Sequence, residues 1–565
     1  MLSMPANRHI SANSNRASVA SCSEFPSRTD RLPTRAGLSV PARSFAIICF
    51  FLCAVLISSA TDVVTYHNDI ARTGQNLQET ILTIGNVTSS SFGKLFTLPV
   101  DGVIDAQPLY LSAVSVPGKG THNVVYAVTE NDSVYAFDAD NGTLLWQAST
   151  LGASESPSDD LGCSQISPQI GITSTPVIDR DSGPNGTIYV VAMSKNSASY
   201  FQRIHALDIT TGEEEFGGPV AIAAKYPGTG DSSHNGHVVF APKHYAERQA
   251  LLLLNGVIYT AWTSHCDQRP YTGWLIGYNE STLAQASVLN LTPHGSEGSI
   301  WQSGAGIASD GSNLFFLDAN GTFDTTLNKK GFPSKGDYGN GFIKVSTMNN
   351  KLRVADYFNM FDTISESEGD KDLGSGGVIV LPPMKDATGT VRHLAVGAGK
   401  NHNIYLVDRT NMGKFNPNND DAIYQEIDGA LKAGEWGTSA YFNGNLYFGP
   451  QANHLLQFQF SQAKLASSPQ SKSAAAFRYP GTTPSVSANG SKSGIIWAIE
   501  HSDPEDVLHA YDATNLANEL YNSSQAGNQR DQFGTASHFG TPMIVNGKVY
   551  VGTTNNVTVF GLLAQ

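Results

Sequence analysis

The densest mixture of titratable and aromatic side chains in the sequence lies at residues 264–274, SHCDQRPYTGW. Two roles are open to its aspartate. If Asp267 lies beside Arg269, the two side chains form a structural ion pair; if it faces a binding site, its carboxylate could act as a base. The residue types leave both alternatives open, and Asp267 is the first candidate catalytic residue.

A second set of side chains could hold a metal ion and a flat ring. Glu297 and Trp301 occur in residues 295–306, GSEGSIWQSGAG, and Asn340 occurs in residues 337–342, DYGNGF. Carboxylate and amide oxygens suit Ca²⁺, and an indole offers a stacking surface. We expect Glu297 and Asn340 as candidate metal ligands and Trp301 as a candidate cofactor contact.

Three further candidates lie beside short apolar segments, where loops of a repeated β-fold would gather at one mouth. Asp356 in VADYF is a second candidate catalytic carboxylate. Lys400 in AGKNHNIYLVD and Trp436 in GEWGTS are candidate cofactor-binding residues. The simpler alternative for each is a turn or a contact between neighbouring sheets. No G-x-S-x-G, phosphate-loop or H-E-x-x-H motif occurs.

The N-terminal segment indicates an exported protein. Residues 45–57, FAIICFFLCAVLI, form a short apolar run after a basic stretch and before Ser-Ser-Ala, the pattern of a secretory signal cleaved after Ala60. An uncleaved run acting as a membrane anchor is the alternative. Cleavage leaves Cys163 and Cys266, and an oxidising compartment favours a disulfide between them. Two separate thiols remain the other alternative.

A repeated unit must position these candidates. Residues 124–146, VVYAVTENDSVYAFDADNGTLLW, predict three strands joined by tight turns. An Asp or Asn recurs where the second strand of the unit ends, and its side chain can bond backbone amides two residues on, which closes the turn. The members of this set are Asp138, Asp208, Asn279, Asp408 and Asp512.

The leading strand of the unit recurs eight times, which predicts an all-β, eight-bladed propeller in residues 61–565, with seven blades as the alternative. Residues 94–100, KLFTLPV, are expected to close the ring as the outer strand of the last blade. The segment with His67, Asp69 and Arg72 is expected to be a structural clamp. The leading segments begin at Gln107, Ser174, Leu251, Ser303, Ser375, Gly437, Thr483 and Gly540.

Composition limits the classes of partner. Charged residues make up 15% of the chain, and 54 glycines suit a turn-rich β-protein. The formal net charge of −14 argues against binding to nucleic acid or an anionic membrane. We expect a small molecule, a glycan or a protein as the partner, and contact with a membrane only through an uncleaved N-terminal segment.

Several motifs resemble the PQQ-like β-propeller superfamily, which includes the quinoprotein alcohol dehydrogenases. They span residues 62–564 and are closest to bacterial secreted pyrrolo-quinoline-quinone-repeat proteins of unassigned activity. The motifs are RTGQN at Arg72, SHCD at Ser264, SIWQSGAG at Ser299, DLGSGG at Asp372, GKNHNIYLVDR at Gly399 and GKVYVGTTN at Gly547.

A quinoprotein dehydrogenase implies an adjacent pair of cysteines beside the cofactor, a Ca²⁺ shell, a catalytic aspartate and a stacking tryptophan. Glu297, Asn340, Asp356 and Trp301 could take these roles, but the chain has no adjacent cysteines. Two hypotheses follow. The first is a secreted or periplasmic propeller that binds a ligand or protein without chemistry of its own. The alternative is a PQQ- and Ca²⁺-dependent dehydrogenase that oxidises alcohols or sugars.

Overall fold

Short runs of β-branched and aromatic residues form nearly all of the secondary structure, and Asn, Asp and Gly form most of the turns between them. The structure, a computed structural model, describes residues 61–564. The expected signal sequence lies outside the described residues. The prediction of an all-β fold is confirmed.

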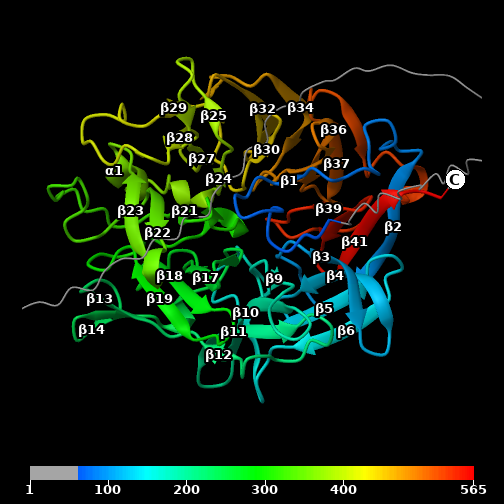
Figure 1. The fold of residues 1–565 in the computed structure, drawn as a ribbon, viewed down its shortest axis with the longest axis horizontal. Coiled ribbons are helices and arrows are strands. Elements are labelled where there is room, and N and C mark those ends of the chain that lie inside the picture. The colour runs from blue at the N-terminus through cyan, green and yellow to red at the C-terminus, as the bar shows by residue number, and fades with distance from the viewer. Residues whose placement is uncertain (1–60, 565) are drawn as a thin grey trace, which may run out of the picture. The chain divides into compact units, whose positions relative to one another are not determined.

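Eight sheets of four to six strands account for most of the described residues. Figure 1 shows them following one another in chain order around a common centre. The first sheet consists of β3 (Leu109–Val116), β4 (Gly120–Val128), β5 (Ser133–Asp138) and β6 (Leu144–Ser149). The second consists of β7 (Ser156–Asp159), β8 (Gln169–Ile170), β9 (Val177–Asp179), β10 (Thr187–Lys195), β11 (Tyr200–Asp208) and β12 (Val220–Ala221). The third consists of β16 (Leu252–Leu254), β17 (Val257–Trp262), β18 (Trp274–Asn279) and β19 (Gln285–Asn290), and the fourth of β20 (Ala308–Ser309), β21 (Asn313–Leu317), β22 (Phe342–Ser346) and β23 (Arg353–Phe358).

The remaining four sheets continue in the same direction around the centre (Figure 1). The fifth sheet consists of β24 (Val378–Val380), β27 (Leu394–Ala398), β28 (Ile404–Asp408) and β29 (Gln425–Ile427). The sixth consists of β30 (Ala440–Phe442), β31 (Asn445–Phe448), β32 (Asn453–Ser461), β33 (Lys464–Leu465) and β34 (Ser471–Phe477). The seventh consists of β1 (Gln75–Asn76), β35 (Ser485–Asn489), β36 (Lys492–Glu500), β37 (Val507–Asp512) and β38 (Glu519–Asn522), and the eighth of β2 (Phe92–Pro99), β39 (Met543–Val545), β40 (Lys548–Gly552) and β41 (Asn556–Leu562).

Two smaller sheets and one α-helix lie in the connecting segments. They are the sheet of β13 (Lys225–Pro227), β14 (Ser233–His234) and β15 (His237–Val239), the pair β25 (Met384–Lys385) and β26 (Val391–Arg392), and α1 (Thr363–Glu368). Within residues 61–564, no helix has the length and apolar character needed to cross a membrane.

Each leading segment expected from the sequence contains one strand of a different large sheet, from β3 in the first to β39 in the last. The sheet of β39, β40 and β41 takes its fourth strand from the other end of the described chain. Strand β2 pairs antiparallel with β41, with Phe92 opposite Leu562 and Pro99 opposite Asn556.

The repeated Asp or Asn closes its turn in every unit where it was expected. The Asp138 carboxylate accepts a hydrogen bond from the backbone N–H of Asp140 at 2.8 Å. Asp208, Asp408, Asp512 and Asn279 accept equivalent bonds two residues on, at 2.7, 3.0, 2.8 and 3.1 Å. The predicted turn chemistry is therefore confirmed at five corners.

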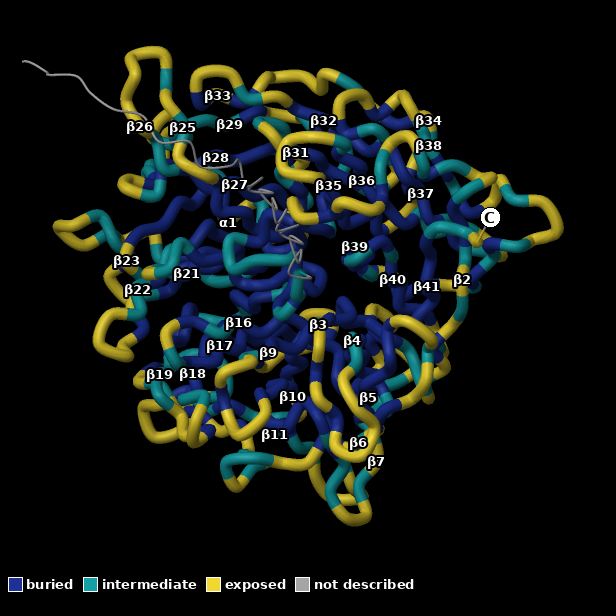
Figure 2. Tube along the Cα trace, turned by 45° about the vertical axis from the view of Figure 1, so that its right-hand side comes forward, coloured by how far each residue is buried: buried dark blue, intermediate teal, exposed yellow. Residues whose placement is uncertain are grey.

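The hydrophobic core lies between the faces of neighbouring sheets. Phe92 of β2 packs against Trp497 of β36 and Phe560 of β41, with ring centroids 5.4 and 6.4 Å away. Figure 2 shows buried strands inside and exposed turns at the periphery. Both faces of the inner strands are covered, so strands such as β5 and β17 are buried at every residue and show no alternation of buried and exposed positions.

The segment from Val63 to Gly74 crosses the sheets and bonds to their strands. Backbone N–H groups of Ser309, Val380, Tyr441 and Val486 donate to carbonyls of residues 70, 71, 73 and 74. Arg72 is fully buried; its guanidinium donates to the carbonyls of Ile307 and Leu251, at 2.9 and 3.2 Å. This is the structural clamp expected from the sequence.

Candidate functional site

Loops from five successive sheets meet around a cavity of about 270 Å³. Four of the expected site residues line it: Asp267, Trp301, Lys400 and Trp436. Asp267 follows β17, Trp301 precedes β20, Lys400 follows β27 and Trp436 precedes β30. These residues are up to 169 positions apart in the sequence, and the fold brings them to one place because the loops share one end of their sheets.

A disulfide between Cys163 and Cys266 forms part of the cavity wall. Cys163 lies between β7 and β8, and Cys266 follows β17, so the bond joins two neighbouring sheets. The predicted pairing is confirmed. A second link joins the same loops, because the Gln268 side chain donates to the Leu161 carbonyl at 3.2 Å. The wall is therefore held covalently and by a hydrogen bond.

Lys400 is held by two aspartates on one side of the cavity. Its Nζ lies 2.5 Å from Asp370 Oδ1 and 2.8 Å from Asp372 Oδ1. Burial lowers the pKa of Lys400. The charges of Asp372 and Asp370 raise it by a larger amount, so the pKa of Lys400 lies above its ordinary value. Burial raises the pKa of Asp372, and Lys400 opposes part of that rise. The lysine is accordingly protonated, and its charge is shared between two carboxylates.

Asp267 lines the cavity and is not paired with Arg269. The Arg269 guanidinium binds Asp231 instead, with Nε 2.7 Å from Oδ2. Asp267 Oδ1 accepts hydrogen bonds from the Tyr271 hydroxyl at 2.7 Å and the Ser264 hydroxyl at 3.1 Å. Asp267 therefore does not form the ion pair with Arg269, and its exposed carboxylate lies at the cavity.

The two indoles of the cavity are fixed by aromatic contacts outside it. Trp301 meets Phe539 edge to face at 5.4 Å, and Trp436 meets Tyr479 in the same way at 5.6 Å. The Tyr479 hydroxyl also donates to Gln165, which lies in the loop that carries Cys163, at 3.0 Å. Both indoles are half-buried, which leaves part of each available to a ligand.

Three expected site residues do not line the cavity. Asp356, in β23, lies 3.2 Å from Lys414 Nζ and accepts the backbone N–H of Met412 at 3.0 Å. The Asn340 Oδ1 accepts the Leu373 N–H at 2.9 Å. Glu297 is half-buried, and burial followed by the charge of Asp267 raises its pKa. None of Asp356, Glu297 and Asn340 lines the cavity with the other four, although Glu297 lies near enough to Asp267 to feel its charge.

The cavity contains functional groups that the sequence reasoning did not select. Asn320 and Asp370 line it, and Asn320 Nδ2 donates to Asp370 Oδ1 at 2.8 Å. Asn320 precedes Gly321, so the sequence signal there is that of a tight turn. Asp370 lies in the polar segment after α1, where no motif marks it. Within the described part of the chain, no group of three or more His, Cys, Asp or Glu side chains could hold a metal ion.

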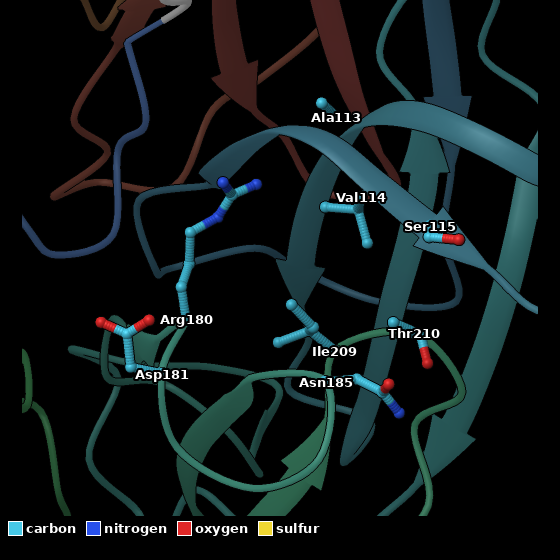
Figure 3. A pocket seen from close by; sticks show the side chains of 8 residues that line it. All are labelled: Ala113, Val114, Ser115, Arg180, Asp181, Asn185, Ile209 and Thr210. Atoms are coloured by element: carbon cyan, nitrogen blue, oxygen red, sulfur yellow. The ribbon is translucent and has the colours of Figure 1, made fainter.

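A second cavity, of about 310 Å³, lies between the end of β3 and the turn that joins β9 to β10 (Figure 3). Two of its polar groups already have partners, and Asp181 is exposed. Arg180 Nε lies 3.1 Å from Asp62 Oδ2, and Asn185 Nδ2 donates to Asp208 Oδ2 at 2.6 Å. Because four of the expected site residues and the disulfide line the first cavity, we take it as the candidate functional site.

Comparison with known proteins shows the fold. No protein-family model matches the sequence, and no curated protein matches it. Quinohemoprotein alcohol dehydrogenase from Comamonas testosteroni matches with a TM-score of 0.55 and 15% identity, over 89% of this chain and 80% of that chain. Quinohemoprotein alcohol dehydrogenase ADHIIG from Pseudomonas putida HK5 matches with a TM-score of 0.55 and 13% identity, over 89% and 81%.

A europium-containing methanol dehydrogenase also matches, with a TM-score of 0.55 and 12% identity, over 89% of this chain and 98% of that chain. At these identities the similarity is one of fold. The chain has the fold of the PQQ-like β-propeller superfamily, and the resemblance seen in its sequence is confirmed at that level.

Proposed function

We propose that this protein is an exported, eight-bladed β-propeller that binds a small molecule in the cavity beside the disulfide, without chemistry of its own. The eight large sheets would be the blades, and the pairing of β2 with β41 would close the ring and remove its open edges. The disulfide supports export, because such bonds persist in oxidising compartments.

The observation that carries the proposal is the convergence of two indoles, a disulfide and several polar side chains on one cavity. The residues come from separate sheets, so the wall is built on a rigid frame. Binding sites for small molecules are concave, largely preformed and lined by aromatic groups with a few polar ones. The cavity of about 270 Å³ has this character.

The fold makes PQQ and Ca²⁺ the first ligands to test against the lining residues. A disulfide and Trp301 line the same cavity, as a stacked quinone would require, and this favours a PQQ-dependent dehydrogenase as the second candidate function. The charges do not fit. PQQ is a tricarboxylate, whereas the lining has three aspartates and one lysine whose charge is already shared.

The expected metal ligands do not fit either. Asn340 uses its amide oxygen on the backbone of Leu373, and neither Asn340 nor Glu297 lines the cavity. The lining therefore shares an indole and a disulfide with the quinone site that the resemblance implies, and it differs from that site in charge, in the expected metal ligands and in having no adjacent cysteines. For this reason we place binding without chemistry before dehydrogenation.

Intrinsic tryptophan fluorescence tests the proposal. The purified protein should respond saturably to at least one member of a set of cationic, neutral and anionic small molecules, and Trp301→Phe with Trp436→Phe should remove the response. Trp146→Phe is the matched control, because Trp146 lies in β6 and its indole N–H donates to Ile209. A response lost equally in the control variant would contradict binding at the cavity.

The second candidate is tested on the same preparation. We expect no PQQ to remain with the protein after gel filtration, with or without Ca²⁺, and no reduction of a redox dye by alcohols or sugars. Retained PQQ together with dye reduction that Asp267→Asn or Asp372→Asn abolishes would replace binding without chemistry by dehydrogenation.

A further inference from the structure

The cavity beside the disulfide is acidic. Asp267, Asp370, Asp372 and Lys400 are its charged residues, so its formal charge is −2 when all four are ionised. Lys400 is tied to Asp370 and Asp372, which leaves the exposed carboxylate of Asp267 without a cationic partner. The whole chain carries a formal charge of −14, which attracts cations and repels anions over a longer range.

Asn320 supplies an unused hydrogen-bond acceptor. Its side chain is 8% exposed, and its Oδ1 has no hydrogen-bond partner. The orientation of the amide is fixed, because its Nδ2 donates to the Asp370 carboxylate at 2.8 Å, an arrangement that only the NH₂ end can make. A buried acceptor without a donor is costly, so a ligand that donates an N–H or O–H to it would gain stability.

The two indoles complete the lining. Trp is the best aromatic partner for a cation, and the attraction grows as water is excluded. Trp301 and Trp436 are half-buried and held edge to face by Phe539 and Tyr479. A group that is both cationic and a hydrogen-bond donor satisfies the indoles, the Asp267 carboxylate and the Asn320 oxygen together.

We infer that the cavity binds an organic ammonium ion that carries at least one N–H, that is, a protonated amine. Because this rests on the proposed function, it names the class of ligand for the same site. A quaternary ammonium ion would satisfy the indoles and the carboxylate, and it would leave Asn320 Oδ1 without a donor. An anion would meet the carboxylates, and a neutral alcohol would lose the attraction of the charges.

A series of probes of similar shape tests the inference by calorimetry at pH 7 and low salt: 2-phenylethylammonium, its N,N,N-trimethyl analogue, 2-phenylethanol and 3-phenylpropionate. We expect the primary ammonium ion to bind at least about tenfold more tightly than the alcohol, and the carboxylate not to bind. Asp267→Asn should weaken ammonium binding by about tenfold. Asn320→Ala should remove the preference for the primary over the quaternary ion.

Asp181→Asn is the matched control, because Asp181 lies at the other cavity, beside Arg180 (Figure 3). It should leave every affinity unchanged, and thermal unfolding checks that each variant folds. Equal binding of alcohol and ammonium ion, tighter binding of the carboxylate, or no binding of any probe would each overturn the inference. If the neutral or anionic probe binds and the Trp301 and Trp436 variants lose it, the proposed function stands and only the ligand class is wrong.

Discussion

Cys163 and Cys266, 103 residues apart in the sequence, are joined by a disulfide that links the loops of two neighbouring sheets at the edge of the candidate site. The bond serves two purposes at once. It lowers the conformational entropy of the unfolded chain. It also holds the cavity wall, where Asp267 directly follows Cys266.

Removal of this disulfide should lower both stability and affinity. Cys163→Ser with Cys266→Ser should reduce the free energy of unfolding by about 2–4 kcal/mol, because the unfolded chain regains the entropy of a long open loop. Urea unfolding measures this. A reductant should lower the stability of the unchanged protein by a similar amount and leave the double variant as it is; an equal effect on both would contradict the assignment.

The repeated corner aspartates should each contribute a modest, equivalent stabilisation. Asp512 accepts hydrogen bonds from the Thr514 N–H at 2.8 Å and the Thr514 hydroxyl at 2.7 Å. Asp512→Ala should cost about 1–2 kcal/mol in urea unfolding. Asp512→Asn should cost less, since Asn279 fills the same corner. Asp421→Ala, at an exposed position, is the control and should change little.

These corners explain why so much of the fold could be predicted. A side chain that bonds its own backbone two residues on needs no distant partner, so its signal is local and repeats with the unit. Most of the leading strands share this property, because a tight turn follows them; β9 and β24 are the exceptions, with longer connections to β10 and β27. The disulfide was also predictable, since residues 61–565 contain only two cysteines.

The candidate site was less predictable because convergence depends on distant parts of the chain. Asp267, Trp301, Lys400 and Trp436 were selected by residue type beside short strands, and the fold does bring them together. Glu297 and Asn340 were selected in the same way. Asn340 uses its amide oxygen on the backbone of Leu373, and Glu297 lies outside the cavity lining, so residue type alone does not separate these two from the residues that converge.

Arg72 should be among the most sensitive positions for stability. Its buried guanidinium also donates to the Tyr66 carbonyl at 2.9 Å, and burial lowers its pKa to about 10. Arg72→Met should cost at least about 3 kcal/mol, because several buried carbonyls lose their donor. Arg180→Met, with a side chain 39% exposed, should cost about 1 kcal/mol or less in the same denaturant series. Equal losses of stability in the two variants would contradict the role of Arg72 as a structural clamp.

Stability should fall as the pH rises from 5 to 9. Burial, followed by the charge of Asp105, raises the pKa of Glu130 to about 9. The unfolded chain releases that proton near its ordinary pKa of about 4.3, so the folded state loses stability as the pH rises through this window. Glu130→Gln should flatten this part of the curve.

Glu155 is the matched control for Glu130. Several contacts together lower the pKa of Glu155 to about 2, and the hydrogen bond from Arg203 has the largest effect. Its stabilisation is present above the unfolded pKa and is lost as the pH falls toward 2. Glu155→Gln should therefore lower stability at pH 7 without altering the slope above pH 5. A slope that both variants change equally would contradict the assignment to Glu130.

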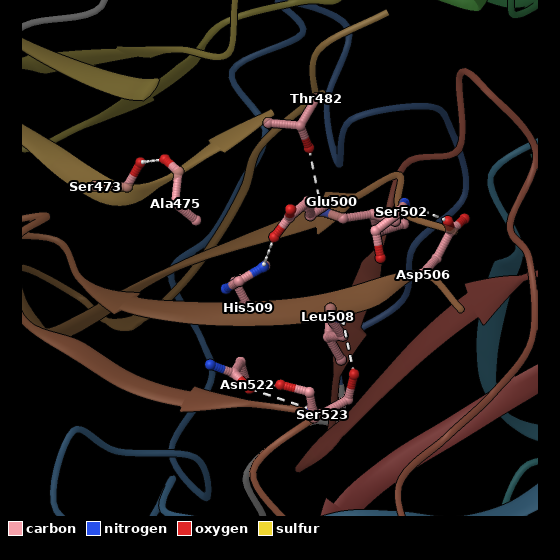
Figure 4. Close-up of polar contacts among 12 residues, drawn as sticks. Ser473, Ala475, Thr482, Glu500, Ser502, Asp506, Leu508, His509, Asn522 and Ser523 are labelled. Atoms are coloured by element: carbon pink, nitrogen blue, oxygen red, sulfur yellow. Dashed lines mark hydrogen bonds and ion pairs between the residues drawn. The ribbon is translucent and has the colours of Figure 1, made fainter. Parts of the chain in front are cut away.

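His509 should hold its proton to a higher pH than a free histidine does. The imidazole lies between two carboxylates, with Nε2 2.9 Å from Glu500 (Figure 4) and Nδ1 2.6 Å from Glu519. Burial lowers the pKa of His509, but these two hydrogen bonds and the charges of the glutamates raise it overall. The protonated ring thus joins β36, β37 and β38.

The stabilisation from His509 is fully present below the unfolded pKa of about 6.5 and is lost as the pH rises through the higher folded value. His509→Gln should therefore lower the free energy of unfolding more at pH 6 than at pH 9. NMR titration of the imidazole should give a pKa above 6.5 in the unchanged protein, and Glu500→Gln or Glu519→Gln should lower it. A pKa at or below 6.5 would show that burial outweighs the two carboxylates and that the ring joins the three strands as a neutral group.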